Sequence, residues 1–196
     1  MGLEFLDLEF FTKKLNPVTS AQIFTRTDEF HPHGLFSELI FGVQGSIERK
    51  KKFSYINLNS NVIHPTAYKI FIRLDRKLEK MFSTELSFSL DKDQNLVSDD
   101  NGVTGIEEFI KLFPKIKFRG ETPDREAFID VLEKAYKKGT LFINKIPVIP
   151  PEQRPLFKDE TGRYNSDKIN DFYLMNLNKA IQIKSFGKKG TMYDLM

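Results

Sequence analysis

Three prolines lie within five residues of one another in the segment 141–183: Pro147, Pro150 and Pro151. Proline has no amide hydrogen to donate, and it disfavours helix at the residue before it. We therefore predict that residues 141–149 form a strand that continues into stiff, extended backbone. A charged turn at Gly162 follows, and residues 167–183 then carry apolar side chains at the spacing of an amphipathic helix.

The composition excludes several classes of protein. With 196 residues, 40% hydrophobic content and 19 phenylalanines, the chain can bury the core of one domain or slightly more. A net charge of +3 gives no polycationic field, so nucleic-acid binding must come from local patches. The absence of cysteine excludes a disulfide scaffold, a zinc ribbon and a thiol nucleophile. No apolar run approaches about 20 residues, so we expect no membrane partner and a cytoplasmic protein.

Periodicity predicts short strands and helices along the rest of the chain. Residues 16–42 are rich in turn formers and predict an ordered irregular arm. Four aromatic rings are expected to pin this arm by packing: Phe24, Phe30, Phe36 and Phe41. A strand is predicted at residues 53–58, one helix at residues 65–82, and the first strand of a hairpin at residues 86–90. For residues 3–15, strand and helix both remain open.

Two further helices are predicted from their first residues. Thr104 and Glu107 have the spacing of a capping box. Thr122 precedes Pro123 and an apolar helical face that stops at Gly139. No repeat, heptad seam or low-complexity tract occurs. The fold class is therefore predicted to be α+β, an irregular module with short strands, several helices and a long terminal helix.

Four motifs occur in order along the chain: GLFSELIFG at 34–42, YINL and HPTAY at 55–68, IPVIPPEQRP at 146–155, and GRYNSDKINDFY at 162–173. The series resembles the amino-terminal clamp part of the largest, β′-type subunit of multisubunit DNA-directed RNA polymerases. The matching stretches of that family read GLF-x-x-x-IFG, S-P-T-A-H, LPV-L/I-PP-x-x-RP, and GGRF followed by SDLNDLYR. His64 stands where the family has serine, and residues 17–27 resemble the family's zipper region.

The chain departs from the family at two places. Residues 43–52 stand where many relatives insert a four-cysteine zinc ribbon, so no zinc is expected. The NADFDGD motif, whose aspartates hold the catalytic Mg²⁺ in the family, does not occur in the sequence. We therefore assign no catalytic residue and no bound cofactor to this chain, and expect Mg²⁺ in the assembled polymerase. A divided subunit of a large bacteriophage fits these departures, and a truncated or interrupted gene would give the same sequence.

The resemblance implies a single β′-like clamp module over residues 1–196. Its predicted parts are a zipper-like arm, a strand and helix, a hairpin with a helical insertion, and a strand followed by a lid-like loop and the first clamp helix. These parts correspond to residues 16–42, 53–82, 83–140 and 141–183.

The lid-like loop of this family lies at the upstream edge of the RNA–DNA hybrid and helps to part the transcript from the template. Lys158, Arg163 and, before them, Arg154 can meet phosphates through charge. Tyr164 offers a face on which a base can stack. In the structural alternative, Arg154 pairs with an acid, Tyr164 packs in a core and the loop is merely solvated.

Four consecutive cations follow the first motif and can also contact DNA phosphates: Arg49, Lys50, Lys51 and Lys52. A solvated turn in place of the zinc ribbon is the alternative interpretation.

Residues 167–183 match the first helix of the family's clamp coiled coil, where σ-type initiation factors dock. Asn178, Lys179 and Gln182 are therefore predicted to contact a σ-like factor, and an ordinary solvated face is the alternative. The apolar stripe of this helix is predicted to comprise Ile169, Phe172, Tyr173, Leu177, Ala180 and Ile181. Such a stripe requires a partner helix on this chain or on another.

Metal sites and self-contained catalytic sites are not predicted. His31 and His33 flank a proline, and spacing places no third ligand near them. No Ser-His-Asp order, phosphate-binding glycine loop or dinucleotide fingerprint occurs.

The sequence thus predicts part of a DNA-directed RNA polymerase, a nucleotidyltransferase whose catalysis belongs to the assembly. The expected partners are a β-like subunit, the remaining β′-like polypeptide, the DNA template, the nascent RNA and a σ-like factor. The alternative is a non-catalytic, clamp-like regulator that binds a host polymerase or an initiation factor. A structural virion protein is a third interpretation. A viral version would act in the host cytoplasm and can be packaged in the virion.

Overall fold

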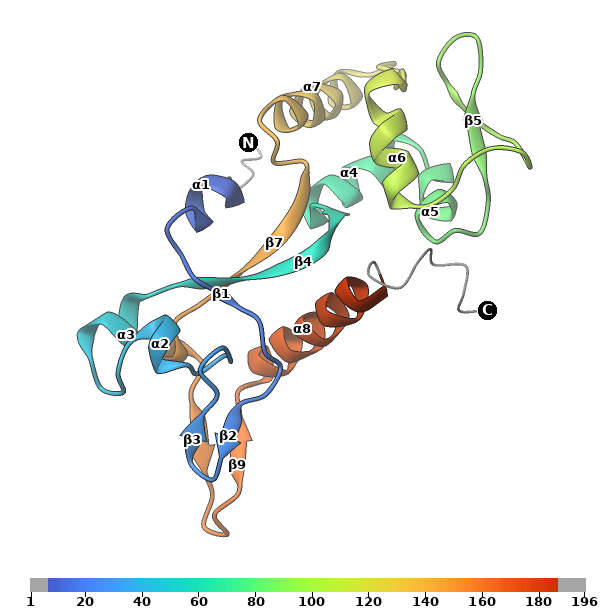
Figure 1. Cartoon of the computed structure of the whole chain (residues 1–196). Coiled ribbons are helices and arrows are strands. Elements are labelled where there is room, and N and C mark those ends of the chain that lie inside the picture. Colours follow the sequence, from blue (N-terminus) through green and yellow to red (C-terminus); the bar gives the residue numbers. More distant parts are fainter. Residues whose placement is uncertain (1–6, 187–196) are drawn as a thin grey trace. The chain divides into compact units, whose positions relative to one another are not determined.

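The computed structural model describes residues 7–186, which form an α+β fold as predicted (Figure 1). The chain divides into two compact units. Unit 1 comprises Met1–Asp7 and Asn61–Ile143, and unit 2 comprises Leu8–Ser60 and Asn144–Met196. The single clamp module predicted over residues 1–196, with its four parts, stays a prediction. The boundaries fall inside two strands, so no change in composition marks them.

Unit 2 contains α1 (Leu8–Thr12), β1 (Pro17–Val18), β2 (Phe24–Arg26), β3 (Glu29–Phe30), α2 (Glu38–Phe41), α3 (Ile47–Lys51), η2 (Pro151–Gln153), β8 (Leu156–Lys158), β9 (Tyr164–Ser166) and α8 (Lys168–Phe186). Strands β4 (Ser54–Ile63) and β7 (Phe142–Val148) each run across a unit boundary. A three-stranded sheet has the order β1-β4-β7, with β1 parallel to β4. The segment left open by the sequence contains helix α1.

The core of unit 2 gathers residues from distant parts of the chain: Val18, Leu35, Phe36, Ile40, Phe41, Ile56, Val148, Tyr173, Leu177 and Ala180. The arm of residues 16–42 is pinned by its aromatic rings, as predicted. Phe30 stacks between Phe24 and Phe36, at centroid distances of 5.3 Å and 5.5 Å. Gly34 cannot be another residue without rearrangement, because a Cβ there would lie 2.4 Å from the carbonyl oxygen of Gln22.

Unit 1 contains α4 (Pro65–Leu74), α5 (Lys77–Phe82), β5 (Phe88–Leu90), β6 (Leu96–Ser98), α6 (Ile106–Leu112), η1 (Phe113–Lys115) and α7 (Pro123–Lys137). Strands β5 and β6 pair antiparallel, which confirms the predicted hairpin. The Thr122 hydroxyl accepts from the amide of Arg125, which confirms the predicted start of α7.

Two helix predictions in unit 1 were wrong. The single helix at 65–82 is two helices, because Asp75 ends α4 and its Oδ1 accepts from the amide of Lys77 at 2.9 Å. Apolar spacing continues through this break and does not reveal it. The expected capping box fails because the Thr104 hydroxyl donates to the carbonyls of Met81 and Leu86. Helix α6 then begins after Gly105, with no side-chain cap.

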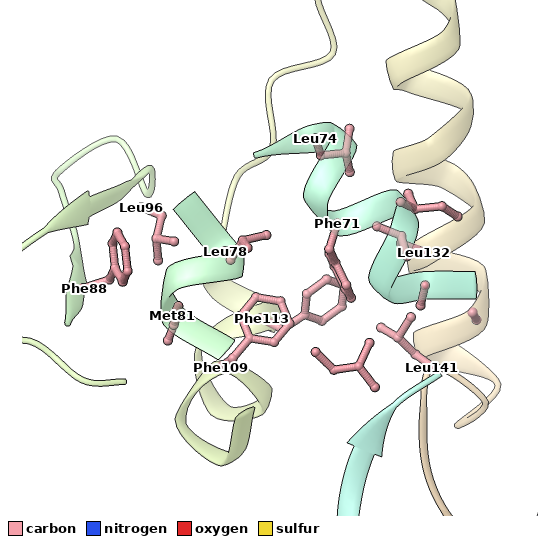
Figure 2. Packing of buried hydrophobic residues seen from close by; sticks show 14 residues of the cluster. Phe71, Leu74, Leu78, Met81, Phe88, Leu96, Phe109, Phe113, Leu132 and Leu141 are labelled. Atoms are coloured by element: carbon pink, nitrogen blue, oxygen red, sulfur yellow. The ribbon is translucent and has the colours of Figure 1, made fainter. Parts of the chain in front are cut away.

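An aromatic cluster fills the core of unit 1 (Figure 2). The ring of Phe71 meets Phe109 at 5.0 Å and Phe113 at 5.5 Å, with interplanar angles of 84° and 80°. Such edge-to-face contacts add to the stabilisation from burial alone.

Candidate nucleic-acid interface

The lid-like loop is a two-stranded hairpin in unit 2. Strands β8 and β9 pair antiparallel, with Lys158 opposite Tyr164. Asp159 Oδ1 closes the turn by accepting from the amides of Thr161 and Arg163, both at 2.9 Å. The hydroxyl of Thr161 also donates to it, and these hydrogen bonds hold the pKa of Asp159 below its ordinary value. Gly162 has φ +81°, a conformation that glycine adopts without strain.

One buried guanidinium fixes the base of this hairpin. The side chain of Arg154 is 0% exposed. It donates to the carbonyl of Ile149 at 2.9 Å, to Asn170 Oδ1 at 2.9 Å and to the carbonyl of Leu35 at 2.6 Å. Asn170 Nδ2 donates back to the carbonyl of Arg154 at 2.9 Å. A planar fork of donors is what allows one side chain to hold several separate acceptors.

Aromatic rings enclose the same guanidinium. Its central carbon lies 5.0 Å from the ring centroid of Phe36, 5.3 Å from that of Phe41 and 5.6 Å from that of Tyr173. Burial lowers the pKa of Arg154 to about 10, which leaves it charged at neutral pH. Three of the motifs found in the sequence, at 34–42, 146–155 and 162–173, therefore meet at a single charge.

This geometry contradicts the phosphate contact predicted for Arg154. A fully enclosed side chain cannot reach a nucleic acid without unfolding of its surroundings. The alternative pairing with an acid was also wrong, because the acceptors are two carbonyls and a side-chain amide. Arg154 instead positions the hairpin.

A second hairpin, formed by β2 and β3, lies beside the first (Figure 1). Asp28 at its tip accepts from the hydroxyl of Tyr164. Lys158 Nζ lies 3.1 Å and 3.2 Å from the two carboxylate oxygens of Asp28. The ring of Phe24 lies 4.7 Å from that of Tyr164. We call Phe24, Asp28, Lys158 and Tyr164 the hairpin clasp.

The titratable groups of the clasp shift one another's pKa values. Hydrogen bonds from Tyr164 and then Lys158 lower the pKa of Asp28. The bond to Asp28 raises the pKa of both Lys158 and Tyr164. Asp28 lies 130 residues before Lys158, so the sequence gave no indication of this partner.

Part of the paired hairpins stays exposed beside the clasp, so this part can contact another molecule. Phe157 is 56% exposed and Tyr164 is 39% exposed. Arg163 is exposed on the turn, and Lys158 keeps 49% of its side chain exposed beside Asp28. An aromatic edge with a few cations on a stiff base can act as a wedge and can contact phosphates or bases.

The four basic residues 49–52 that follow the first motif differ in burial and in their contacts. Arg49 is buried and donates to the carbonyls of Gly42 and Phe36, both at 2.9 Å, which contradicts its predicted DNA contact. Lys52 Nζ lies 2.7 Å from Glu48 Oε1. Lys50 and Lys51 are exposed and keep their predicted role as a proposal.

The buried face of helix α8 agrees with the predicted stripe only in part. Tyr173, Leu177 and Ala180 are buried as expected, but Phe172 is 61% exposed. Ile181 is also exposed, and the buried face takes in Asn170 instead. The amide of Ile169 donates to Asp167 Oδ1 at the start of the helix.

The predicted factor-contact residues Asn178, Lys179 and Gln182 lie on the exposed side of α8. Large apolar side chains share the exposed surface of the helix: Phe172, Met175, Ile181, Ile183 and Phe186.

In the acidic loop of unit 1, the carboxylates of Asp91 and Asp99 accept hydrogen bonds from backbone amides within their own turns. Asp91 Oδ1 accepts from the amides of Asp93 and Asn95, and Asp99 Oδ1 accepts from the amide of Asn101. Across residues 7–186, no group of three or more His, Asp or Glu side chains is arranged to hold a metal ion. No helix within the same residues is long and apolar enough to cross a membrane.

Comparison with known proteins finds relatives for part of the chain. No protein-family model matches it. The DNA-directed RNA polymerase subunit β′ of Mesoplasma florum is 24% identical over 152 residues, which cover 64% of this chain and 12% of that subunit. The subunit β′ of Streptococcus pneumoniae (strain Hungary19A-6) is 38% identical over 55 residues, which cover 26% of this chain and 4% of that subunit. Over part of its length, the chain is similar to the β′ subunit of bacterial DNA-directed RNA polymerases.

Proposed function

We propose that this chain contributes to RNA synthesis as part of a β′-type polymerase subunit, in which the paired hairpins help to part RNA from the DNA template. The observation that carries the proposal is the mounting of an exposed hairpin on the buried Arg154, where three β′-like motifs meet. Separation of strands needs a rigid obstacle rather than a catalytic group. The similarity to β′ subunits supports the same interpretation.

Each exposed residue then has a defined role. Arg163, Lys158, Lys50 and Lys51 would contact phosphates, and Tyr164, whose ring packs on Phe24, would contact a base through the part of the ring that stays exposed. The nucleotidyl transfer itself, with its Mg²⁺, would belong to other polypeptides of the assembly, together with a β-like subunit.

The exposed side of α8 would meet a σ-like factor through Asn178, Lys179 and Gln182. Its large exposed apolar side chains support a protein partner on this helix, because such residues seldom gather on a free surface.

We further propose a divided bacteriophage subunit that acts in the host cytoplasm. The support is the short segment 43–52, which holds helix α3 in place of a zinc ribbon. A clamp-like regulator that binds a host polymerase or an initiation factor is the second candidate, and the exposed face of α8 fits it equally well.

Purification of the tagged chain from its native source, with mass spectrometry and an RNA-synthesis assay, separates these candidates. The proposal predicts an active complex that contains β-like subunits and a polypeptide with the three-aspartate motif. Recovery of only an intact host polymerase or an initiation factor, without new activity, would favour the regulator.

A further inference from the structure

Unit 1 carries a surface feature that the proposed function does not use. The segment 116–119 separates two concavities, with volumes of about 320 Å³ and about 280 Å³. Ile116, Lys117 and Phe118 line both of them. We call the segment and its two concavities the unit 1 groove.

The backbone of the segment lies outside the helices and strands and is held by hydrogen bonds at Lys117 and Arg119. The amide of Lys117 donates to the carbonyl of Gln94 at 2.9 Å. Arg125 Nε donates to the carbonyl of Arg119 at 2.8 Å, and Arg125 Nη2 donates to the carbonyl of Leu74 at 3.0 Å. The groove is thus formed in advance, which reduces the entropy lost when a ligand binds.

The floor of the larger concavity is apolar. Phe113 and Leu132 are buried at its base, where they belong to the core of unit 1 (Figure 2). Tyr136 stands at its side, 39% exposed. Its ring meets that of Phe113 at a centroid distance of 5.1 Å and an angle of 64°, so the two rings pack edge to face and the face in this contact is covered. Stacking of a nucleic-acid base needs an open ring face, so this floor favours an apolar side chain of a peptide.

The rim of the groove is positively charged. Its lining includes six basic residues: Lys77, Lys115, Lys117, Arg119, Arg125 and Lys137. The acidic residues of the two linings are Asp75 and Glu133. Asp75 accepts from the backbone amide of Lys77, and the basic residues of the two linings outnumber Asp75 and Glu133.

We propose that the unit 1 groove docks an acidic segment of a partner protein, which inserts one apolar side chain between Phe113, Leu132 and Tyr136. The charge of the rim selects the acidic segment, and the volume of the larger concavity suits a single large side chain. This surface belongs to unit 1, so the proposal stands apart from the nucleic-acid role of the hairpins in unit 2.

Fluorescence anisotropy tests the proposal with the full chain and a labelled peptide of glutamates around a central Phe-Leu pair. Lys117→Glu with Lys137→Glu is expected to weaken binding about tenfold, because both charges line the same concavity. Glu133→Lys is expected to strengthen it, and a peptide with Ser-Ser in place of Phe-Leu should bind less tightly. Lys13→Glu with Lys14→Glu changes the net charge equally on exposed residues of unit 2 and should leave affinity unchanged.

Several outcomes would overturn the proposal. They are no saturable binding of the acidic peptide, equal weakening by both double variants, or no gain from Glu133→Lys. A single-stranded thymidine oligonucleotide that displaces the peptide and loses affinity with Lys117→Glu would assign the groove to nucleic acid instead. Thermal unfolding of each variant verifies that the exposed substitutions leave the fold intact.

Discussion

The charged side chain of Arg154 is buried away from solvent, and the contacts around it explain how the fold tolerates this burial. A buried charge is costly unless its donors are satisfied. Here a guanidinium meets two carbonyls and an amide oxygen, and ring faces cover it. Removal of any one partner leaves polar groups buried and unpaired.

Arg154→Lys should therefore destabilise the protein by about 3 kcal/mol, because an ammonium cannot reproduce the planar fork that reaches three acceptors. Urea unfolding measures the change. Arg163→Lys, on the exposed turn, is the matched control and should alter the free energy of unfolding by less than about 0.5 kcal/mol. Equal effects of the two substitutions would contradict the role given to Arg154.

The hairpin clasp should depend on pH at both extremes. The lowered pKa of Asp28 means that its contribution is present above 3.8, its ordinary value, and is lost as the pH falls through the lower folded value. The raised pKa values of Lys158 and Tyr164 mean that their contributions are present below 10.5 and 10.0 and are lost as the pH rises through the folded values.

NMR signals of the Tyr164 ring should therefore stay constant between these limits and shift at each of them. Asp28→Asn should move the ring signals at neutral pH toward the positions reached in acid. Unchanged signals in that variant would show that the clasp does not form in solution.

The sequence alone could not identify these residue-scale partners. Arg154 and Arg49 stand among prolines and charged residues, a context typical of the surface. Their acceptors include the backbone carbonyls of Leu35 and Phe36, up to 119 residues away, and every residue type has a backbone carbonyl, so the sequence does not identify which one accepts. Composition therefore suggested phosphate contacts where the fold makes internal ones.

At the scale of elements, local rules predicted most boundaries. The cap at Thr122, the alternation before the loop at 91–95 and the prolines after β7 each act on their neighbours and were interpreted correctly. At the break, the side chain of Asp75 accepts from the amide of Lys77, the first residue of the next helix, and continuous apolar spacing concealed this break. The buried face of α8 was only partly predicted, because Asn170 replaces Phe172 on it.

Asp159→Ala should loosen the turn of the lid-like hairpin, because Oδ1 accepts from the amides of Thr161 and Arg163. Amide hydrogen exchange at those two residues should become faster. Global stability should change by less than about 1 kcal/mol, since the turn is exposed. A large loss of global stability would show that the hairpin is part of the core.

The exposed face of α8 is a partner surface in this account. Phe172→Ser with Met175→Ser should leave stability nearly unchanged but reduce recovery of a σ-like factor or other protein partner in pull-downs. Leu177→Ala, on the buried face, should instead cost about 2–4 kcal/mol. If the serine variant recovered the partner as fully as the unchanged protein does, α8 would not be part of the interface.

At the scale of the whole molecule, three of the four β′-like motifs lie in unit 2 together with the candidate interface, and the motif at 55–68 runs from unit 2 into unit 1. The motifs at 34–42 and 146–155 lie in different halves of the chain, and Arg154 joins them. Under the two proposals, the nucleic-acid role lies in unit 2 and the docking of an acidic segment lies in unit 1. Substitutions in one unit should leave the function of the other intact.

Site-specific photo-crosslinking in the active complex tests the central claim most directly. A photoreactive residue in place of Phe157, exposed on the lid-like hairpin, should crosslink to nascent RNA or template DNA during synthesis. The same residue in place of Tyr68, exposed in unit 1, should not. A synthesising complex in which Phe157 yields no nucleic-acid crosslink, or no more than Tyr68, would contradict the account.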